Sequence, residues 1–344
     1  MGRKKKESKE NKMDEDIENY ILSMEKQFGK GTIMKMAEGY IVNVPAIPTD
    51  IYELDKALGV GGFPKGRIIE VYGAESSGKT SLLLYLTAQV QRNSGNVLYV
   101  DVEHAIDIEY GKKAGVNWQE VFLSQPDSGE QALTIVERAV DTGKFDLIVV
   151  DSVASLVPEA ELMGEMGDSQ IALQARLMSK AMRKLAGKVD KTKTCLVFIN
   201  QIREKINVMF GSPETTSGGR ALKFYASIRL RLAKTANLLD GKIKVGAKIK
   251  AVVKKNKVAP PFKEAEFKIM YDEGVSKTCS IIDQAIENKV IKKAGAWFSY
   301  KDENIAQGYD ALRKLMINEP NRLEEIKKDL FNKKEKSNET QSME

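Results

Sequence analysis

The chain has 344 residues, of which 42% are hydrophobic and 30% are charged, and its formal net charge is +6. This length suffices for about two domains with a sizeable core, and the composition is typical of a soluble globular protein. No apolar run approaches the roughly 18 residues of a membrane span, and the Lys-rich N-terminus lacks the apolar core of a secretion signal. The sequence therefore argues against membrane and secreted classes and predicts a cytoplasmic protein.

The small numbers of histidine and cysteine residues limit which catalytic and metal-binding sites the chain can form. His104 is the only histidine, which excludes His-based triads and His-rich metal sites. Cys195 and Cys279 are far apart and lack paired metal-ligand spacing. This usage fits a reducing cytoplasm and argues against a structural zinc site. The mildly basic balance permits a nucleic-acid partner without requiring one.

The N-terminal part is predicted to be an arm. Residues 1–16 are almost wholly polar and are expected to be disordered. Apolar residues then recur at helical spacing, which predicts a short helix at residues 17–27. A short β-prone piece follows at residues 32–36. It is either a packed connector or a strand donated to the sheet of another subunit, and the residues alone favour neither.

Residues 73–80 form the pattern Gly-x-x-x-x-Gly-Lys-Ser/Thr of a phosphate-binding loop, between an apolar run and a helical run. The loop comprises Gly73, Ala74, Glu75, Ser76, Ser77, Gly78, Lys79 and Thr80. Its glycines let several backbone N–H groups face one anion, and the following helix N-terminus adds partial positive charge. Lys79 can reach the β and γ phosphates, and the Thr80 hydroxyl can bind Mg²⁺. The alternative is a Gly/Ser-rich turn before a helix.

Apolar runs alternate with amphipathic segments between residues 67 and 201. Strands are expected at 68–72, 97–102, 121–124, 145–150 and 195–199, and helices at 80–92, 106–114, 129–141 and 171–189. This alternation predicts an α/β fold with a parallel sheet. Ligands of such sheets bind beyond the carboxyl ends of the strands, so the chemistry is expected there.

Three polar residues end these predicted strands. Asp151 has the position of a carboxylate that holds Mg²⁺, or it caps the next element. Glu103 could deprotonate the water that attacks a γ-phosphate, and Gln201 could sense that phosphate. For both residues, a solvated strand end is the open alternative.

Two long segments without clear periodicity interrupt the core, at residues 158–170 and 202–219. The second combines cations, an aromatic residue, hydroxyls and glycines, which suits phosphate contacts along a single nucleic-acid strand. The alternative is a mobile surface loop.

The remaining chain is expected to form a short helix near 221–225, strands at 228–233, 242–257 and 262–271, and then a small α+β part. That part has helices at 279–290 and 309–317, with a strand at 296–300 between them. The strand at 242–257 is very Lys-rich. It is either a solvated face or a strand that presents cations to a neighbour's nucleotide.

Eight stretches together resemble the bacterial RecA recombinase family, over roughly residues 17–320. They are 73–80, 101–105, 124–127, 129–133, 149–153, 200–203, 211–219 and 221–227. The phosphate loop alone indicates only an NTPase, whereas the combination through Ser227 indicates this family. The resemblance implies an α/β, RecA-type P-loop NTPase core with a mainly parallel central sheet, an N-terminal helix-plus-strand arm and a small C-terminal α+β domain.

The predicted organisation has four parts. Residues 1–40 would be the arm and subunit-polymerisation segment, and 41–274 the ATPase core with two DNA-binding loops. Residues 275–331 would be the small domain, and 332–344 a polar tail. The tail is Lys-rich where the family usually has an acidic one, and Ala74, Gln170, Asn207 and Asp272 also depart from the usual family residues.

The resemblance implies roles in ATP hydrolysis. Glu103 would be the general base, Gln201 the γ-phosphate sensor, and Thr80 with Asp151 the Mg²⁺ ligands. The adenine would meet Asp107 and Tyr110. The residues implied in catalysis are Glu103, Lys79, Gln201, Lys255 and Lys257, of which the last two would enter the adjacent subunit's ATP site like arginine fingers.

The resemblance also implies contacts with DNA and between subunits. The DNA-binding set is Gly164, Glu165, Met166, Gly167, Asp168, Ser169, Arg176, Arg203, Lys205, Asn207, Val208, Phe210, Thr215, Thr216, Ser217, Gly218, Gly219 and Arg220. The interface set is Ile33, Met34, Lys223 and Phe224. Head-to-tail contacts of this kind do not close and build a helical filament, which favours strand donation by residues 32–36.

The implied activity is ATP-dependent homologous recombination. The protein would form filaments on single-stranded DNA, pair it with homologous duplex, promote strand exchange and stimulate self-cleavage of a repressor in the SOS response. ATP and Mg²⁺ would be the cofactors. Two alternatives remain: a ring-forming helicase with the same core, and a nucleotide-gated scaffold that binds partner proteins.

Overall fold

The computed structural model describes residues 16–29, 32–33, 44–165, 172–204 and 214–341. It divides into two compact units, residues 1–43 and residues 44–344. In the first unit, residues 16–28 form a helix where the sequence predicts one. Thr32 and Ile33 lie in a bend, and the rest of the predicted strand, including Met34, lies outside the described residues.

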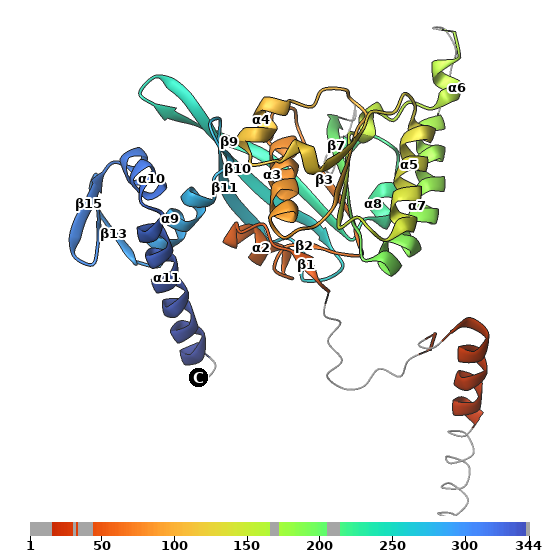
Figure 1. Cartoon of the computed structure of the whole chain (residues 1–344), viewed down its shortest axis with the longest axis horizontal. Helices are drawn as coiled ribbons and strands as arrows, with labels where there is room; N and C mark the ends of the chain where they lie inside the picture. The colour runs from red at the N-terminus through yellow and green to blue at the C-terminus, as the bar shows by residue number, and fades with distance from the viewer. Residues whose placement is uncertain (1–15, 30–31, 34–43, 166–171, 205–213, 342–344) are drawn as a thin grey trace, which may run out of the picture. The chain divides into compact units, whose positions relative to one another are not determined.

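A ten-stranded sheet organises the second unit, in the order β12-β11-β10-β9-β3-β7-β6-β4-β5, with β8 paired to β7 (Figure 1). Its strands are β3 (Ile68–Gly73), β4 (Val97–Asp101), β5 (Val121–Ser124), β6 (Leu147–Asp151), β7 (Cys195–Glu204), β8 (Glu214–Thr216), β9 (Ile228–Asp240), β10 (Ile243–Asn256), β11 (Glu264–Met270) and β12 (Gly274–Val275). Pairing is parallel from β5 across to β9 and antiparallel from β9 to β12. The predicted fold class, with its mainly parallel central sheet, is confirmed.

Helices cover both faces of this sheet. They are α2 (Tyr52–Leu58), α3 (Lys79–Arg92), α4 (Ile108–Lys113), α5 (Gly129–Thr142), α6 (Glu159–Leu162), α7 (Leu173–Thr192) and α8 (Ala221–Tyr225); short 3-10 turns lie at Trp118–Glu120 and Val153–Ser155, and β1 (Ala46–Ile47) pairs with β2 (Phe63–Pro64). One core joins α2 and α3 to strand residues such as Val71 and Val149. The other joins α5, α7 and α8 to residues such as Val150 and Phe198. Because successive strand residues point to opposite faces, each central strand serves both cores.

The C-terminal elements form a smaller layer with its own core. They are α9 (Lys277–Glu287), β13 (Ile291–Ala294), β14 (Trp297–Tyr300), β15 (Glu303–Gln307), α10 (Tyr309–Asn318) and α11 (Pro320–Gln341). The three strands make an antiparallel sheet whose Phe298 packs with Ile282 and Met316. Sequence patterns missed β13, β15 and α11, and α11 continues through most of the predicted polar tail. The predicted domain bounds stay a prediction.

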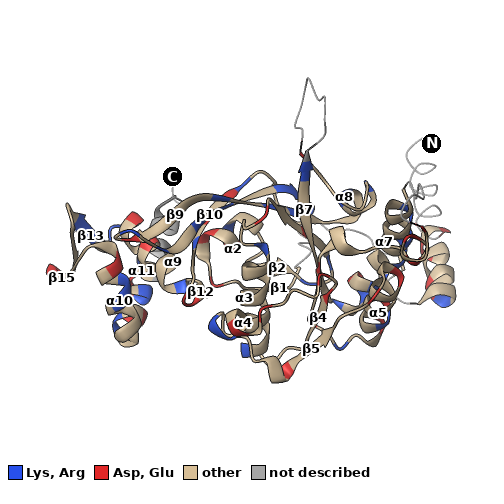
Figure 2. Ribbon diagram, turned by 90° about the horizontal axis from the view of Figure 1, so that it is seen from above, with Lys and Arg blue, Asp and Glu red and all other residues tan. Residues whose placement is uncertain are grey.

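The structure corrects the prediction of one continuous loop at residues 202–219. Instead, β7 continues to Glu204 and pairs antiparallel with β8, so that Ile202 lies opposite Thr216 and Arg203 opposite Thr215. The apolar run ends at Ile199, but pairing with β3 continues the strand to Gln201, and pairing with β8 continues it from Ile202 to Glu204. The predicted strand at 228–233 was likewise too short, because β9 and β10 form a long hairpin. Figure 2 shows this hairpin running toward the C-terminal elements, where Lys314 of α10 lies 3.6 Å from Asp240.

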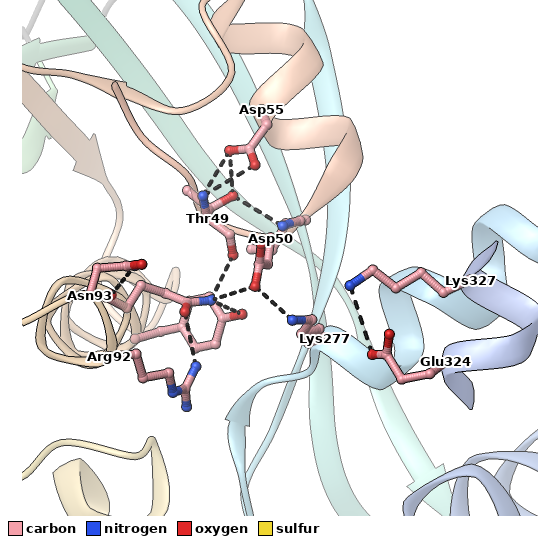
Figure 3. A network of polar contacts seen from close by, with 11 residues as sticks. Thr49, Asp50, Asp55, Arg92, Asn93, Lys277, Glu324 and Lys327 are labelled. Atoms are coloured by element: carbon pink, nitrogen blue, oxygen red, sulfur yellow. Dashed lines mark hydrogen bonds and ion pairs between the residues drawn. The ribbon is translucent and has the colours of Figure 1, made fainter. Parts of the chain in front are cut away.

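A polar cluster joins α2 to the start of α9 (Figure 3). Lys277 Nζ donates a hydrogen bond to Asp50 Oδ2 at 2.6 Å. The Thr49 backbone N–H and hydroxyl donate to Asp55, with the hydroxyl at 2.7 Å from Oδ1. Burial would raise the pKa of Asp50, but the Lys277 ammonium holds it below its ordinary value. Burial raises the pKa of Asp55 to about 6, although the Thr49 hydrogen bonds oppose the shift.

We expect Asp55 to make the free energy of unfolding depend on pH. Its pKa is about 6 in the folded protein against an ordinary 3.8, so the folded state binds this proton more tightly. The resulting stabilisation is fully present below about pH 4 and is lost as pH rises through about 6. As pH rises from about 4 to about 6, the free energy of unfolding of the wild-type protein should fall on the order of 1–3 kcal/mol relative to that of Asp55→Asn, measured by urea denaturation.

Glu109→Gln is the control for this series, because the Glu109 side chain is 76% exposed. The free energy of unfolding of Glu109→Gln should differ from that of wild type by the same amount at every pH in this range. A constant difference for Asp55→Asn as well would contradict the pKa assigned to Asp55.

Candidate nucleotide site and nucleic-acid interface

The parallel strands bring the predicted site residues to one edge of the sheet. Gly73 of β3 lies opposite Gln201 of β7, and Asp101 of β4 lies opposite Asp151 of β6. Because these strands run in the same direction, their carboxyl ends meet there. Residues far apart in the sequence thereby become neighbours.

The phosphate loop makes a tight turn between β3 and α3. Gly78 has φ +86° at the start of α3, and a Cβ there would approach Ile269 Cδ1 to 2.5 Å. Both facts require glycine at this position. Lys79 Nζ donates hydrogen bonds to the carbonyl oxygens of Gly73 at 3.3 Å and Ala74 at 2.7 Å. Burial lowers the pKa of Lys79, although the carboxylates of Asp151 and Glu103 oppose the shift.

The two predicted Mg²⁺ ligands are in direct contact. Thr80 Oγ1 donates a hydrogen bond to Asp151 Oδ2 at 3.0 Å, and the Tyr99 hydroxyl donates to the same oxygen at 2.9 Å. Asp151 is 8% exposed, and burial raises its pKa to about 6 against the hydrogen bonds of Tyr99 and Thr80. Hydroxyl and carboxylate oxygens are the donors that Mg²⁺ prefers. The sequence patterns gave no sign of Tyr99, whose hydroxyl holds Asp151 in place.

The loop also fits the phosphates of a nucleotide. The Ser77 hydroxyl is buried and has no hydrogen-bond partner among the described residues. An unpaired buried polar group is costly, and a phosphate oxygen would satisfy it. The fit therefore rests on a buried hydroxyl of the loop that has no partner among the described residues.

The predicted base and sensor are also brought together. Gln201 Nε2 donates a hydrogen bond to Glu103 Oε1 at 3.2 Å. The Ser152 hydroxyl donates to the same oxygen at 2.5 Å. Both Glu103 and Gln201 are exposed, so water has access to the carboxylate. This arrangement holds a carboxylate and an amide together at the carboxyl end of the parallel strands.

A cavity of about 310 Å³ adjoins the phosphate loop. Ser76, Tyr110 and Tyr271 are among its lining residues. Tyr110 donates from its hydroxyl to Ser81 Oγ at 2.9 Å, while the Asp107 carboxylate caps α4 by accepting the Tyr110 backbone N–H. Two aromatic side chains beside a phosphate loop suit a planar base. Sequence patterns missed Tyr271, because the turn after β11 shows nothing of its closeness to α4.

Two of the predicted interface residues, Lys223 and Phe224, lie on α8, where the predicted catalytic residues Lys255 and Lys257 contact them. Lys255 Nζ donates hydrogen bonds to the carbonyl oxygens of Lys223 and Phe224, at 2.7 and 2.8 Å, and Lys257 Nζ donates to Phe224 O at 3.3 Å. Burial lowers the pKa of Lys255 to about 8, and the nearby cations of Lys257 and Arg229 add to the shift. The Phe224 ring is exposed at 68%.

The predicted DNA-binding residues are only partly described. Gly164 and Glu165 follow α6, Arg176 is exposed on α7, and Arg203 is exposed on β7. Thr215 Oγ1 accepts a hydrogen bond from Lys223 Nζ at 3.0 Å. The hydroxyls of Thr216 and Ser217 are buried and have no hydrogen-bond partner among the described residues. Gly218 and Gly219 have positive φ, and Arg220 is exposed. Met166, Gly167, Asp168, Ser169, Lys205, Asn207, Val208 and Phe210 lie outside the described residues.

Among the described residues, no helix is both long and apolar enough to cross a lipid bilayer.

Comparison with known proteins bears on this geometry directly. The family model of the RecA N-terminal domain matches residues 15–276, and that of the RecA C-terminal domain matches residues 279–335. Protein RecA of Halalkalibacterium halodurans is 56% identical over 306 residues, which cover 89% of this chain and 88% of that protein. Protein RecA of Geobacter metallireducens is 52% identical over 316 residues, covering 92% and 93%.

A solved structure shows the same fold at lower identity. The crystal structure of the RadB recombinase aligns with a TM-score of 0.51 and 24% identity, covering 67% of this chain and 98% of that one. The family models and the relatives extend over both the ATPase core and the C-terminal elements. The chain therefore belongs to the RecA family, whose members are DNA-dependent ATPases of homologous recombination.

Proposed function

We propose that the chain uses ATP and Mg²⁺ to assemble a helical filament on single-stranded DNA, pairs that strand with homologous duplex and promotes strand exchange. The observation that carries the proposal is the hydrogen bond between Gln201 and Glu103. It joins the start of the second predicted DNA-binding segment to the predicted base of ATP hydrolysis. DNA bound at that segment would thus act on the hydrolytic site.

The residues of the phosphate loop would bind the nucleotide. Backbone N–H groups of residues 73–80 and the Lys79 ammonium would hold the phosphates, and Thr80 with Asp151 would hold Mg²⁺, which supplies positive charge to the phosphates. Glu103 would accept the proton of the attacking water, and the Gln201 amide would orient that carboxylate. Tyr110 and Tyr271 would enclose the base.

The segment at residues 202–219 would bind the backbone phosphates of DNA. Arg203 lies exposed at its start, and Arg220 lies exposed after its end. Contacts of cations with phosphates carry no sequence information and weaken as salt rises. We therefore propose binding with little sequence preference, as homology would be tested by base pairing.

Subunits would join head to tail. β5 is an edge of the described sheet, and its Phe122 and Leu123 are 56% and 42% exposed. An open, apolar strand edge is suited to pair with an added strand, and residues 32–36 are the predicted donor. Lys255 and Lys257 would enter the ATP site of the neighbouring subunit, and Phe224 would lie at that interface.

Two further parts of the proposal rest on family membership. The filament would stimulate self-cleavage of a repressor in the SOS response. The protein would act in the cytoplasm, which agrees with the free thiols of buried Cys195 and Cys279.

Two substitutions should separate nucleotide binding from hydrolysis. Lys79→Ala removes the phosphate-binding ammonium and should abolish binding of a fluorescent ATP analogue. Glu103→Gln keeps the shape of the site but removes the base, so it should retain binding and lose about 10²-fold or more in kcat, measured by phosphate release.

Glu109→Gln, an exposed carboxylate outside the site, should behave like wild type. Wild-type turnover in Glu103→Gln would contradict the role of Glu103 as base. Equal turnover in Lys79→Ala and wild type would contradict the assignment of the phosphate loop.

Phe224→Ala should shorten filaments without unfolding the subunit, because the ring is largely exposed in the single chain. The measurement is filament length by electron microscopy, with ATP and DNA at matched protein concentration. Phe262→Ala is the matched control, since Phe262 is 72% exposed and Phe224 68%. Equal filament lengths for Phe224→Ala and wild type would rule out this contact.

A further inference from the structure

A buried carboxylate lies at the centre of the sheet. Glu70 stands on β3, between β7 and β9, and is 0% exposed. Such a group needs strong partners, because burial removes its water. Its Oε1 accepts a hydrogen bond from Asn200 Nδ2 at 3.0 Å, and its Oε2 accepts one from Arg229 Nε at 2.5 Å. Glu70 thus connects the two strands that flank β3.

Both the nitrogen and the oxygen of the Asn200 side-chain amide make hydrogen bonds. Nδ2 also donates a hydrogen bond to the Ser217 carbonyl oxygen at 3.0 Å, and Oδ1 accepts the Gln201 backbone N–H at 2.9 Å. Asn200 is 0% exposed, so no water substitutes for these partners. A single amide therefore holds both Gln201 and the end of the predicted DNA-binding segment.

Glu70 decides which way this amide points. An ionised carboxylate only accepts hydrogen bonds, so it must face the Asn200 NH₂ group rather than its oxygen. That orientation leaves Oδ1 for the Gln201 N–H and the second amide hydrogen for Ser217. With the amide reversed, both of these contacts would be lost.

The other end of the network reaches the proposed subunit interface. Arg229 of β9 lies opposite Lys255 of β10, and its guanidinium lies 4.5 Å from the centre of the Tyr72 ring. Lys255 in turn holds the carbonyl oxygens of Lys223 and Phe224. The Glu70 carboxylate therefore joins Asn200, which contacts Ser217 and Gln201, to Arg229, whose position on β9 lies opposite Lys255.

We infer that Glu70 is a positioning residue, which fixes the Asn200 amide and thereby couples the Ser217 end of the DNA-binding segment to the Gln201–Glu103 pair. The inference rests on the proposed function, because it takes this segment as the DNA contact. Glu70 itself touches neither nucleotide nor DNA. Its role is to transmit the position of Ser217 to the residues of hydrolysis.

Glu70→Gln tests this role with little change of shape. The new NH₂ group faces a donor, either the Asn200 amide or the Arg229 guanidinium, so the fixed amide orientation is lost. Binding of a fluorescent ATP analogue without DNA should stay within about twofold of wild type. The kcat of hydrolysis with saturating single-stranded DNA should fall about tenfold, a barrier change of about 1.4 kcal/mol.

A double-mutant cycle separates coupling from general damage. If Glu70 acts through the amide, adding Glu70→Gln to Asn200→Ala should lower DNA-stimulated kcat no further. If the loss of kcat in the double variant equals the product of the losses in the two single variants, the inference is overturned. Asp283→Asn is the control: it removes an ion pair with Lys268 away from the site and should leave DNA stimulation unchanged.

The outcomes distinguish this inference from the proposed function. A wild-type protein without DNA-stimulated hydrolysis refutes the proposed function. Wild-type stimulation that persists in Glu70→Gln overturns only the positioning role. If Glu70→Gln does not fold, Asn200→Ala, which keeps the Glu70–Arg229 pair, carries the test. If Asn200→Ala still binds ATP but DNA no longer stimulates its hydrolysis, the inference is supported. If DNA stimulates hydrolysis as fully as in wild type, the inference is overturned.

Discussion

The parallel pairing of four strands is the constraint on which the rest of the structure depends. β3, β4, β6 and β7 must end at one edge of the sheet, because parallel strands share a direction. This pairing brings Gln201 to Glu103, and together with the turn into α3 it brings Thr80 to Asp151. The helices on both faces bury the strands and keep that edge in register. The site is therefore a property of the sheet rather than of any one loop.

Because side chains along a strand alternate between the two faces of the sheet, the two proposed polar clusters lie on different faces. Val149 and Asp151 point to the face that α3 covers, so the carboxylate reaches the Thr80 hydroxyl. On β7, Ile199 joins that same core, whereas Asn200 points to the other face and reaches Ser217. The pair proposed to bind Mg²⁺ and the proposed coupling network thus lie on opposite sides of one sheet. Gln201 at the edge belongs to both.

Local patterns predicted what depends on local sequence. Apolar runs located the central strands, and residues 73–80 identified the phosphate loop, because both signals lie within one short segment. The extension of β7 was missed, since its residues beyond Ile199 are held by pairing with β3 and then with β8 rather than by an apolar run. Tyr271 and the partners of Glu70 were missed for a related reason. Their contacts come from register between strands far apart in sequence, which no single run of residues encodes.

In the proposed function, DNA bound at residues 202–219 controls ATP hydrolysis at Glu103. The most direct measurement is the rate of ATP hydrolysis with and without single-stranded DNA, at two salt concentrations. We expect strong stimulation of hydrolysis by DNA that weakens as salt rises, because the protein contacts phosphates. ATP binding without any DNA-stimulated turnover would contradict it and remove the roles of Glu103 and Gln201.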